Sequence, residues 1–306
     1  FLLQLFSFSL VAALWLSIRY GAWGGLRKAV IFSHDHVPLF FASFLAPKIF
    51  YDAHHYPERT RLYPRVLRRA AGIAVQTKWK VAALQRDFDI PASKIVYWPN
   101  GTDIERFDVP FTREEAREKL GLPQNKKIVL YTGSLQHWKG VATLVRAIEF
   151  LPDQVTVYIV GGEAHAIERL KTLNPKPETL SPVFIGQRPW AEIPLWLKAA
   201  DVLALPNTGR EKVSRFYTSP MKLFEYMASG CPIVASDIPS IREIVDESMV
   251  FFAVPDDPRS FATAIGRALG DPGEAHRRAA RARQEVWKYT WDARAGRILA
   301  MVSRRA

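Results

Sequence analysis

The stretch 219-SPMKLFEYMASGCPIVAS-236 shows most directly how this chain folds. Ser219 and Pro220 suit the start of a helix, where proline loses no donor that the helix needs. Gly230 stands where a helix C-cap is expected, and the apolar run 233–235 has the length of a buried strand. The stretch therefore predicts a loop, a short helix, a tight turn and a buried strand.

The start of this predicted helix is a candidate anion site. The first N–H groups of a helix have no partner inside it, so they attract anions such as phosphate. Met221, Lys222 and Leu223 occupy this first turn, and Glu225 follows further along the helix. The Glu225 carboxylate can accept hydrogen bonds from hydroxyls of whatever the phosphate carries.

Length and charge limit the class of protein. The 306 residues suit two domains, each able to bury a core. The net charge of +12 implies an anionic partner, either a phosphorylated donor, an anionic membrane surface or nucleic acid. No nucleic-acid-binding motif accompanies the charge, so we expect no nucleic acid partner. The single cysteine, Cys231, excludes an internal disulfide and a four-cysteine zinc site.

Residues 1–15 are almost wholly apolar, and the first charged residue is Arg19. The run is short for a transmembrane span, and it lacks the basic start of a signal peptide. We expect a buried amphipathic helix that leads into a strand. Because the chain begins without Met, we also expect the natural chain to start upstream.

Helices and strands alternate along the chain, which predicts parallel sheets with crossover helices. The predicted strands are 29–33, 48–53, 72–76 and 95–98 in the first half, and 128–132, 155–160, 183–185, 202–205 and 233–236, which completes the sheet, in the second. The main predicted helices are 37–46, 112–120, 141–150, 272–288 and a last helix that begins near Thr290.

The stretch 130-LYTGSLQHWKG-140 is the second strong signal. A strand ends in Gly133, where the missing side chain lets a ligand approach the backbone. Lys139 lies in the following loop and can neutralise a diphosphate as a mobile point charge. A solvated loop lysine is the simpler alternative.

Together these two stretches resemble the retaining GT-B glycosyltransferases of the glycosyl transferases group 1, family 4 type. The resemblance implies an α/β fold with two Rossmann-like domains facing a cleft. Residues 1–108 would form a partial acceptor-side domain, 109–288 the nucleotide-sugar domain, and 289–306 a helix that crosses back to the first domain. The N-terminal domain would be incomplete, because its opening strand and the glycine-bearing loop after it are missing.

The resemblance also implies roles for individual residues. Glu225 would bind the ribose, and Lys139 and Lys222 would neutralise the diphosphate. Family members often carry an arginine directly after the glycine, where this chain has Ser134. A second glutamate of the family, eight positions before Glu225, is Tyr217 here, so its hydroxyl or the backbone of residues 219–221 would contact the donor sugar.

Three further segments match the family. Gln187 and Arg188 follow a strand and would receive the nucleotide base. His54 follows another strand and resembles the active-site histidine that binds the donor sugar. The pair His54 and His55 suggests a metal site as an alternative, but no third ligand lies at helical spacing. The turn 100-NGTD-103 also matches, and we interpret it as purely conformational.

The implied activity is transfer of a hexose from a nucleotide diphosphate sugar to an acceptor hydroxyl with retention, in glycan, polysaccharide or glycolipid synthesis. Such a hexosyltransferase would need no cofactor and no metal, and the leaving diphosphate would help to remove the acceptor proton. A GT-B sugar-nucleotide epimerase is one alternative. A non-catalytic or truncated GT-B protein is another, suggested by Tyr217 and the missing strand.

Two arginine clusters indicate a further partner: Arg59, Arg61, Arg65, Arg68 and Arg69, and Arg277, Arg278, Arg281 and Arg283. The first follows His54, so we expect it to face an anionic membrane surface or a phosphorylated acceptor. Solvated helix faces are the alternative for both. The acceptor would be a glycan or a lipid-linked group, and the protein would be cytoplasmic, with peripheral binding to the inner face of the membrane as an option.

Overall fold

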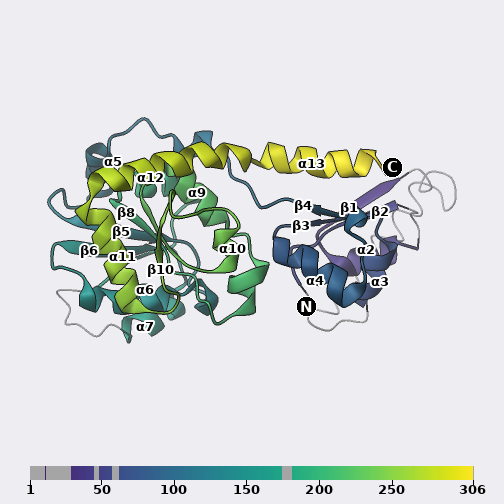
Figure 1. Cartoon of the computed structure of the whole chain (residues 1–306). Coiled ribbons are helices and arrows are strands. Elements are labelled where there is room, and N and C mark those ends of the chain that lie inside the picture. Colours follow the sequence, from purple (N-terminus) through teal and green to yellow (C-terminus); the bar gives the residue numbers. More distant parts are fainter. Residues whose placement is uncertain (1–10, 12–28, 45–47, 57–61, 174–180, 306) are drawn as a thin grey trace. The chain divides into compact units, whose positions relative to one another are not determined.

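The computed structural model describes residues 11, 29–44, 48–56, 62–173 and 181–305. The helix predicted within 1–15 (apart from Val11) and two residues of the first arginine cluster, Arg59 and Arg61, lie outside these ranges. The chain divides into two compact units (Figure 1). The N-terminal unit comprises Phe1–Pro99 and Asp292–Ala306, and the C-terminal unit comprises Asn100–Trp291.

The described part of the C-terminal unit holds a parallel six-stranded sheet in the order β10-β9-β8-β5-β6-β7. All of its neighbouring strands pair in parallel. The strands are β5 (Lys127–Thr132), β6 (Val155–Val160), β7 (Val183–Gly186), β8 (Val202–Leu205), β9 (Ile233–Ser236) and β10 (Phe251–Ala253). The chain winds outward from β5 in one direction and then from β8 in the other, which is the doubly wound Rossmann order.

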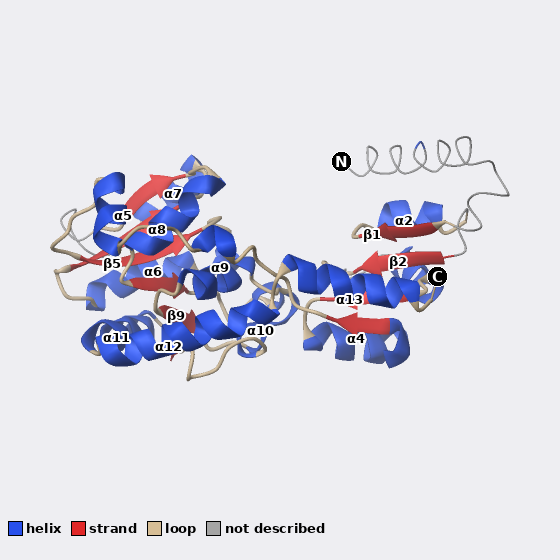
Figure 2. Cartoon of the chain, turned by 90° about the horizontal axis from the view of Figure 1, so that it is seen from above, coloured by secondary structure: helices blue, strands red, loops and turns tan. Residues whose placement is uncertain are grey.

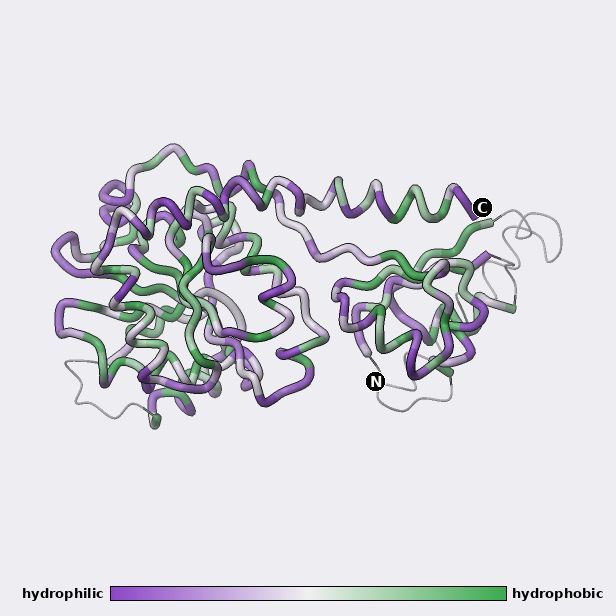
Figure 3. The backbone as a smooth tube through the Cα atoms, in the orientation of Figure 1, coloured by the Kyte–Doolittle hydropathy of each residue, from purple (hydrophilic) through white to green (hydrophobic). Residues whose placement is uncertain are grey.

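Alternating strand residues build one core on each face of this sheet. In β5, Ile128 and Leu130 enter one core, and Val129 and Tyr131 enter the other. The first core includes α5 (Arg113–Leu120), α8 (Ile193–Ala199), α9 (Met221–Ser229) and α10 (Pro239–Arg242). The second includes α6 (Val141–Ala147), α7 (Ala164–Lys171) and α11 (Pro258–Gly270), and α12 (Pro272–Glu285) contributes to both. The strands accordingly appear as hydrophobic segments inside the unit (Figure 3).

The described part of the N-terminal unit holds a parallel four-stranded sheet in the order β1-β2-β3-β4. Figure 2 shows β1 and β2 side by side. The strands are β1 (Val30–Ser33), β2 (Lys48–Asp52), β3 (Gly72–Val75) and β4 (Ile95–Tyr97), and the helices are α2 (His36–Ala42), α3 (Leu62–Arg69), α4 (Lys78–Phe88) and α13 (Trp291–Ser303). Ile49 and Tyr51 of β2 pack with the core that includes α2, α3 and α4. Phe50, between them, packs with Met301 of α13 in a separate cluster.

Local sequence signals set several helix ends. Thr112 caps α5 and exchanges hydrogen bonds with Glu115, which forms a capping box. Thr77 caps α4 at its start. Gly230 ends α9 with φ of 71°, as the sequence predicts for a C-cap glycine.

The unit boundaries differ from the predicted limits at 108 and 288. Residues just after 99 belong to the C-terminal unit, because Ile104 and Phe107 are buried in its core. Tyr289 also belongs there, since its ring packs against Phe224 at 5.2 Å between centroids. The chain therefore passes between units at Pro99–Asn100 and at Trp291–Asp292.

Two details of the predicted elements are wrong. The sheet is not completed by β9, because the short strand β10 pairs with its outer edge. The predicted helices 37–46, 141–150 and 272–288 are shorter in the structure: α2 ends at Ala42, and the last turns of the other two are the 3₁₀ segments Ile148–Phe150 and Val286–Lys288.

Among the described residues, no helix is both long and apolar enough to cross a bilayer.

Candidate functional site

Two cavities lie at the carboxyl end of β5 in the C-terminal unit. The smaller, of about 400 Å³, is lined by Asn100, Thr132, Gly133, Lys139, Trp190, Ile193, Thr218, Ser219, Pro220, Met221, Lys222 and Glu225. The larger, of about 680 Å³, shares Gly133, Trp190 and Ile193 with it. The strand order reverses between β5 and β8, and ligands of doubly wound sheets bind beside such a reversal at the carboxyl ends of the strands.

Lys222 is a buried cation beneath the smaller cavity. Its side-chain nitrogen has no hydrogen-bond partner among the described residues, and it lies 3.6 Å from the centre of the Tyr131 ring. Burial lowers the pKa of Lys222 well below its ordinary value, and the charge of Lys139 lowers it further, while Glu225 raises it. A buried ammonium without a hydrogen-bonding acceptor is costly, which points to a site built for an anion.

Gly133 makes room for this lysine. Its φ is 126°, and a side-chain carbon at this position would lie 2.8 Å from the Lys222 nitrogen. A larger residue would therefore be strained in its backbone and would collide with the ammonium. The sequence predicted that this glycine lets a ligand approach the backbone, and the structure adds that the Lys222 ammonium lies in the space beside it.

Lys139 places a second cation in the same cavity. It ends the 3₁₀ turn His137–Lys139, and its nitrogen lies 3.7 Å from the centre of the Trp138 ring. Burial lowers the pKa of Lys139 to about 8, and the charge of Glu225 raises it. Lys139 can therefore change its charge near neutral pH.

Glu225 is the acidic partner of these lysines. Burial raises the pKa of Glu225, whereas the charges of Lys222, Arg106 and Lys139 and a hydrogen bond with Trp190 lower it. The net effect is a raised pKa. The carboxylate is therefore held among cations and next to an indole, within a cavity that can admit hydroxyl groups.

Trp190 was not predicted as a site residue. It lines both cavities, and the guanidinium carbon of Arg106 lies 3.0 Å from the centre of its ring. The only signal in the sequence is an aromatic residue two positions after Gln187-Arg188, in the loop that follows β7. Its contacts with Arg106 and Glu225 come from distant segments, so no local pattern reveals them.

Asn100 holds the loop in front of α9. Its backbone N–H donates to the Ser219 hydroxyl at 3.0 Å, and its side-chain amide donates to the Ser219 carbonyl at 2.9 Å. Pro220 is the N-cap of α9 and no side chain bonds to the first turn as a cap. Asn100 therefore both lines the cavity and fixes the start of α9, and its purely conformational role stays an interpretation.

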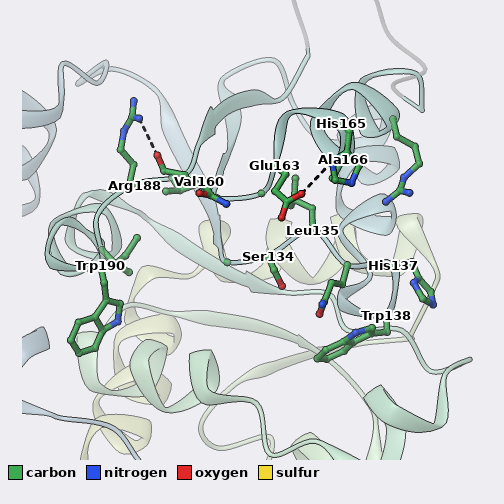
Figure 4. A pocket seen from close by; sticks show the side chains of 17 residues that line it. Ser134, Leu135, His137, Trp138, Val160, Glu163, His165, Ala166, Arg188 and Trp190 are labelled. Atoms are coloured by element: carbon green, nitrogen blue, oxygen red, sulfur yellow. Dashed lines mark hydrogen bonds and ion pairs between the residues drawn. The ribbon is translucent and has the colours of Figure 1, made fainter. Parts of the chain in front are cut away.

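The larger cavity brings together Ser134, Gln187 and Arg188 with the aromatic side chain of Trp138 (Figure 4). In the view of Figure 4, Ser134 lies between Trp190 and Trp138. Arg188 is exposed, and its guanidinium donates to the Gln187 carbonyl at 3.2 Å. An exposed rim with flat side chains suits a planar group such as a nucleotide base.

Three predicted site residues lie elsewhere. Leu223 is fully buried in the core and lines neither cavity. Tyr217 ends the π-helical segment Val213–Tyr217 and also lines neither. His54 follows β2 in the N-terminal unit, where its Nε2 lies 3.1 Å from an oxygen of Asp52. Within the described ranges, no group of three or more His, Cys, Asp or Glu side chains is arranged to hold a metal ion.

The fold is that of known GT-B glycosyltransferases. Anabaena HepE, solved in complex with UDP, superposes with a TM-score of 0.78 at 21% identity, over 97% of this chain and 82% of that chain. Sucrose-phosphate synthase from Thermosynechococcus elongatus superposes with a TM-score of 0.79 at 21% identity, over 99% and 80%. The predicted α/β GT-B class is therefore confirmed.

Sequence comparison then gives the related proteins. Residues 126–271 match the family described as glycosyl transferases group 1. The chain is 30% identical over 262 residues to a D-inositol 3-phosphate glycosyltransferase of Corynebacterium urealyticum, covering 81% of this chain and 60% of the relative. It is 28% identical over 248 residues to the enzyme of that name from Xylanimonas cellulosilytica, covering 77% and 57%. Residues 126–271 are thus similar to the glycosyl transferases group 1 family, and the chain spans somewhat less than two thirds of the length of these relatives.

Proposed function

We propose that the protein is a glycosyltransferase that moves a hexose from a nucleotide diphosphate sugar to an acceptor hydroxyl, with retention of the anomeric configuration. The observation that carries this proposal is the smaller cavity, where Lys139, Lys222 and Glu225 meet at the start of α9. Two cations beside an uncapped helix start suit a diphosphate, and a carboxylate in the same cavity suits the hydroxyls of a ribose.

Catalysis in this proposal is stabilisation of charge on the leaving diphosphate. Negative charge grows there as the bond to the sugar breaks, and buried cations act strongly because little water screens them. Lys139, Lys222 and the first turn of α9 supply the positive charge, so the proposal requires no metal ion. The departing diphosphate takes the proton of the attacking acceptor hydroxyl, and His54 binds the donor sugar.

The base would lie in the larger cavity against the loop of Gln187 and Arg188. A direct contact from Tyr217 to the donor remains a prediction without support from either cavity. We choose UDP-glucose as the first donor to test, because HepE has been solved with UDP and with UDP-glucose. D-inositol 3-phosphate is the first acceptor, given the names of the related proteins.

Calorimetry with UDP, GDP and ADP tests the donor site, and release of nucleotide from the matching sugar nucleotides tests the reaction. Acceptor-dependent release, with an α-linked product from an α-linked donor in proton NMR, would support a retaining transferase. Interconversion of sugar nucleotides without an acceptor would indicate an epimerase instead. Nucleotide binding without turnover, across a panel of donors and acceptors, would indicate a non-catalytic protein.

A further inference from the structure

A buried polar network lies beneath His54 in the N-terminal unit. It consists of Asp52, Gln76, Lys80 and Arg294, each no more than 5% exposed. Buried charges of this kind persist only where their hydrogen bonds are satisfied. None of these four residues was singled out by the sequence.

Lys80 fixes the backbone that carries His54. Its ammonium donates to the carbonyl of Ala53 at 2.9 Å, to the carbonyl of His54 at 2.7 Å and to the side-chain oxygen of Gln76 at 2.6 Å. These three bonds use all three donors of a lysine. Lys80 belongs to α4, so this helix is tied to the turn that follows β2.

Asp52 fixes the imidazole ring. Both of its oxygens lie 2.7 Å from one nitrogen of Arg294, Gln76 donates to it at 3.0 Å, and His54 Nε2 lies 3.1 Å from it. Burial raises the pKa of Asp52, but the bond with His54 and the charge of Arg294 outweigh burial and hold that pKa below its ordinary value. Asp52 is then an ionised acceptor, so His54 donates from Nε2, and its Nδ1 is left as the acceptor when the ring is neutral.

Arg294 brings the C-terminal helix into this network. Besides Asp52, its guanidinium donates to the carbonyl of Trp98 at 2.6 Å and lies 3.5 Å from the carbonyl of Pro99. Trp98 and Pro99 are the last residues before the chain leaves the N-terminal unit, and Arg294 is the third residue after its return. One side chain therefore binds both the crossing segment and the carboxylate that holds His54.

We propose that Asp52, Lys80 and Arg294 are positioning residues for His54. Lys80 sets its backbone, Asp52 sets the orientation and tautomer of its ring, and Arg294 makes this arrangement depend on the docked C-terminal helix. The role of His54 in transfer rests on the proposed function, whereas its tautomer does not.

The first test uses the unmodified full chain. Two-bond proton–nitrogen NMR spectra of histidine-labelled protein, recorded at pH 8.5, report the tautomer of each neutral ring; His54→Gln identifies the signal among the seven histidines. We expect the Nε2–H tautomer for His54. An Nδ1–H tautomer, or a mixture like that of free histidine, would overturn the proposal even if the protein transfers sugar.

The second test compares Arg294→Lys with Arg305→Lys. Arg305 binds carbonyls of Ala71 and Lys94 in the same unit and does not touch Asp52, so it is a matched control. For Arg294→Lys we expect kcat to fall about 10- to 100-fold, the range for misplaced catalytic groups. UDP affinity should change less than about threefold, because the cavities lie in the other unit, and the His54 signal should shift.

The outcomes separate the two proposals. Equal losses in both variants, or loss of UDP binding in Arg294→Lys, would show a purely structural role and overturn the positioning role. If no donor and acceptor pair turns over, the proposed function fails, and the His54 spectra of the wild type and Arg294→Lys still decide whether the network sets the ring.

Discussion

At the scale of single residues, burial opposes charge on each ionisable group of the smaller cavity. It lowers the pKa of Lys139 to about 8, lowers that of Lys222 further below its ordinary value and raises that of Glu225. A diphosphate beside the lysines would favour their protonated forms. If the proposed donor site is correct, we expect nucleotide binding to be coupled to the uptake of protons.

Lys139 gives this coupling a defined direction. With a pKa of about 8, Lys139 is partly deprotonated in the free protein near this pH, and a bound diphosphate would raise its pKa, so we expect UDP binding at pH 8 to take up protons at this lysine. UDP affinity should accordingly fall as pH rises above about 8. Calorimetry in buffers of different ionisation enthalpy measures the uptake.

Lys139→Arg is the matched control, because arginine keeps its charge throughout this range. In the wild type, Lys139 can take up a proton only near and above its pKa of about 8, because it is already protonated below pH 7. The variant should lack this contribution to the proton uptake. Heats at pH 8 that do not depend on the buffer would show that the lysines do not meet the diphosphate.

Glu225→Ala should weaken UDP-sugar binding by about 1–3 kcal/mol, the scale of a hydrogen bond to a charged group. Glu225→Gln keeps the size and the acceptor oxygen but loses the charge, so we expect an intermediate loss. Calorimetry measures both variants. Wild-type affinity in Glu225→Ala would remove this residue from the donor site.

At the scale of elements, the end of β5 and the start of α9 depend on each other. Gly133 follows β5, and Lys222 of α9 occupies the space that a side chain at Gly133 would fill. The Thr132 backbone N–H also donates to the Tyr226 hydroxyl of α9 at 2.9 Å. The cavity is thus built where a strand end and a helix start fit together.

Gly133→Ala should both destabilise the C-terminal unit and weaken UDP binding. The added carbon meets the Lys222 ammonium, and alanine rarely adopts a φ of 126°. Gly266→Ala in α11 is the control, since nothing lies within 4 Å of its added carbon, and alanine favours a helix by about 0.5–1 kcal/mol. Thermal unfolding and calorimetry compare the two.

A stable Gly133→Ala protein with wild-type UDP affinity would contradict this dependence. If Gly266→Ala lowers the thermal stability as much as Gly133→Ala does, the C-terminal unit is destabilised by alanine at either glycine. The loss in Gly133→Ala could then not be assigned to the contact with Lys222.

The same elements show what the sequence could predict. Apolar runs such as 155–160 identify buried strands, and β6 has the predicted bounds, because its core residues are contiguous. The strand β10 was missed, since three residues, Phe251–Ala253, give too short a pattern. Lys222 and Glu225 lie in one sequence motif, so they could be predicted as cavity residues together. The hydrogen bond between Asn100 and Ser219 spans 119 positions, so no local pattern predicts it. Trp190 and the network around Asp52 also depend on contacts that only folding creates.

At the scale of the whole molecule, two arginine clusters contribute to the net charge of +12. In the second arginine cluster, Arg277 and Arg278 pair with Glu274, and Arg283 pairs with Asp108. In the first cluster, Arg65 and Arg68 are exposed on α3, while Arg69 donates to the Ser43 carbonyl at 2.6 Å. We keep the prediction that the first cluster faces an anionic surface, because it follows His54 in the sequence.

We expect the full chain to sediment with anionic vesicles at low salt and less so at high salt. Each arginine near such a surface contributes on the order of 1 kcal/mol, and salt screens it. Changing Arg59, Arg61, Arg65, Arg68 and Arg69 to Gln should abolish the binding. The matched control changes Arg277, Arg278, Arg281 and Arg283 to Gln and should retain most of it.

Equal sedimentation with neutral and anionic vesicles at low salt would refute the membrane surface. If the control variant loses binding and the first variant keeps it, α12 carries the contact instead.

The discontinuous N-terminal unit affects the order in which the chain can fold during synthesis. Domains usually fold in the order in which they leave the ribosome. Here every residue of the C-terminal unit emerges before Asp292, so that unit can fold while the first sheet still lacks α13. Until α13 is made, Asp52 lacks the guanidinium of Arg294, and Phe50 lacks Met301 to cover it. A free chain truncated after Trp291 should therefore protect the second unit from protease and leave the first one susceptible.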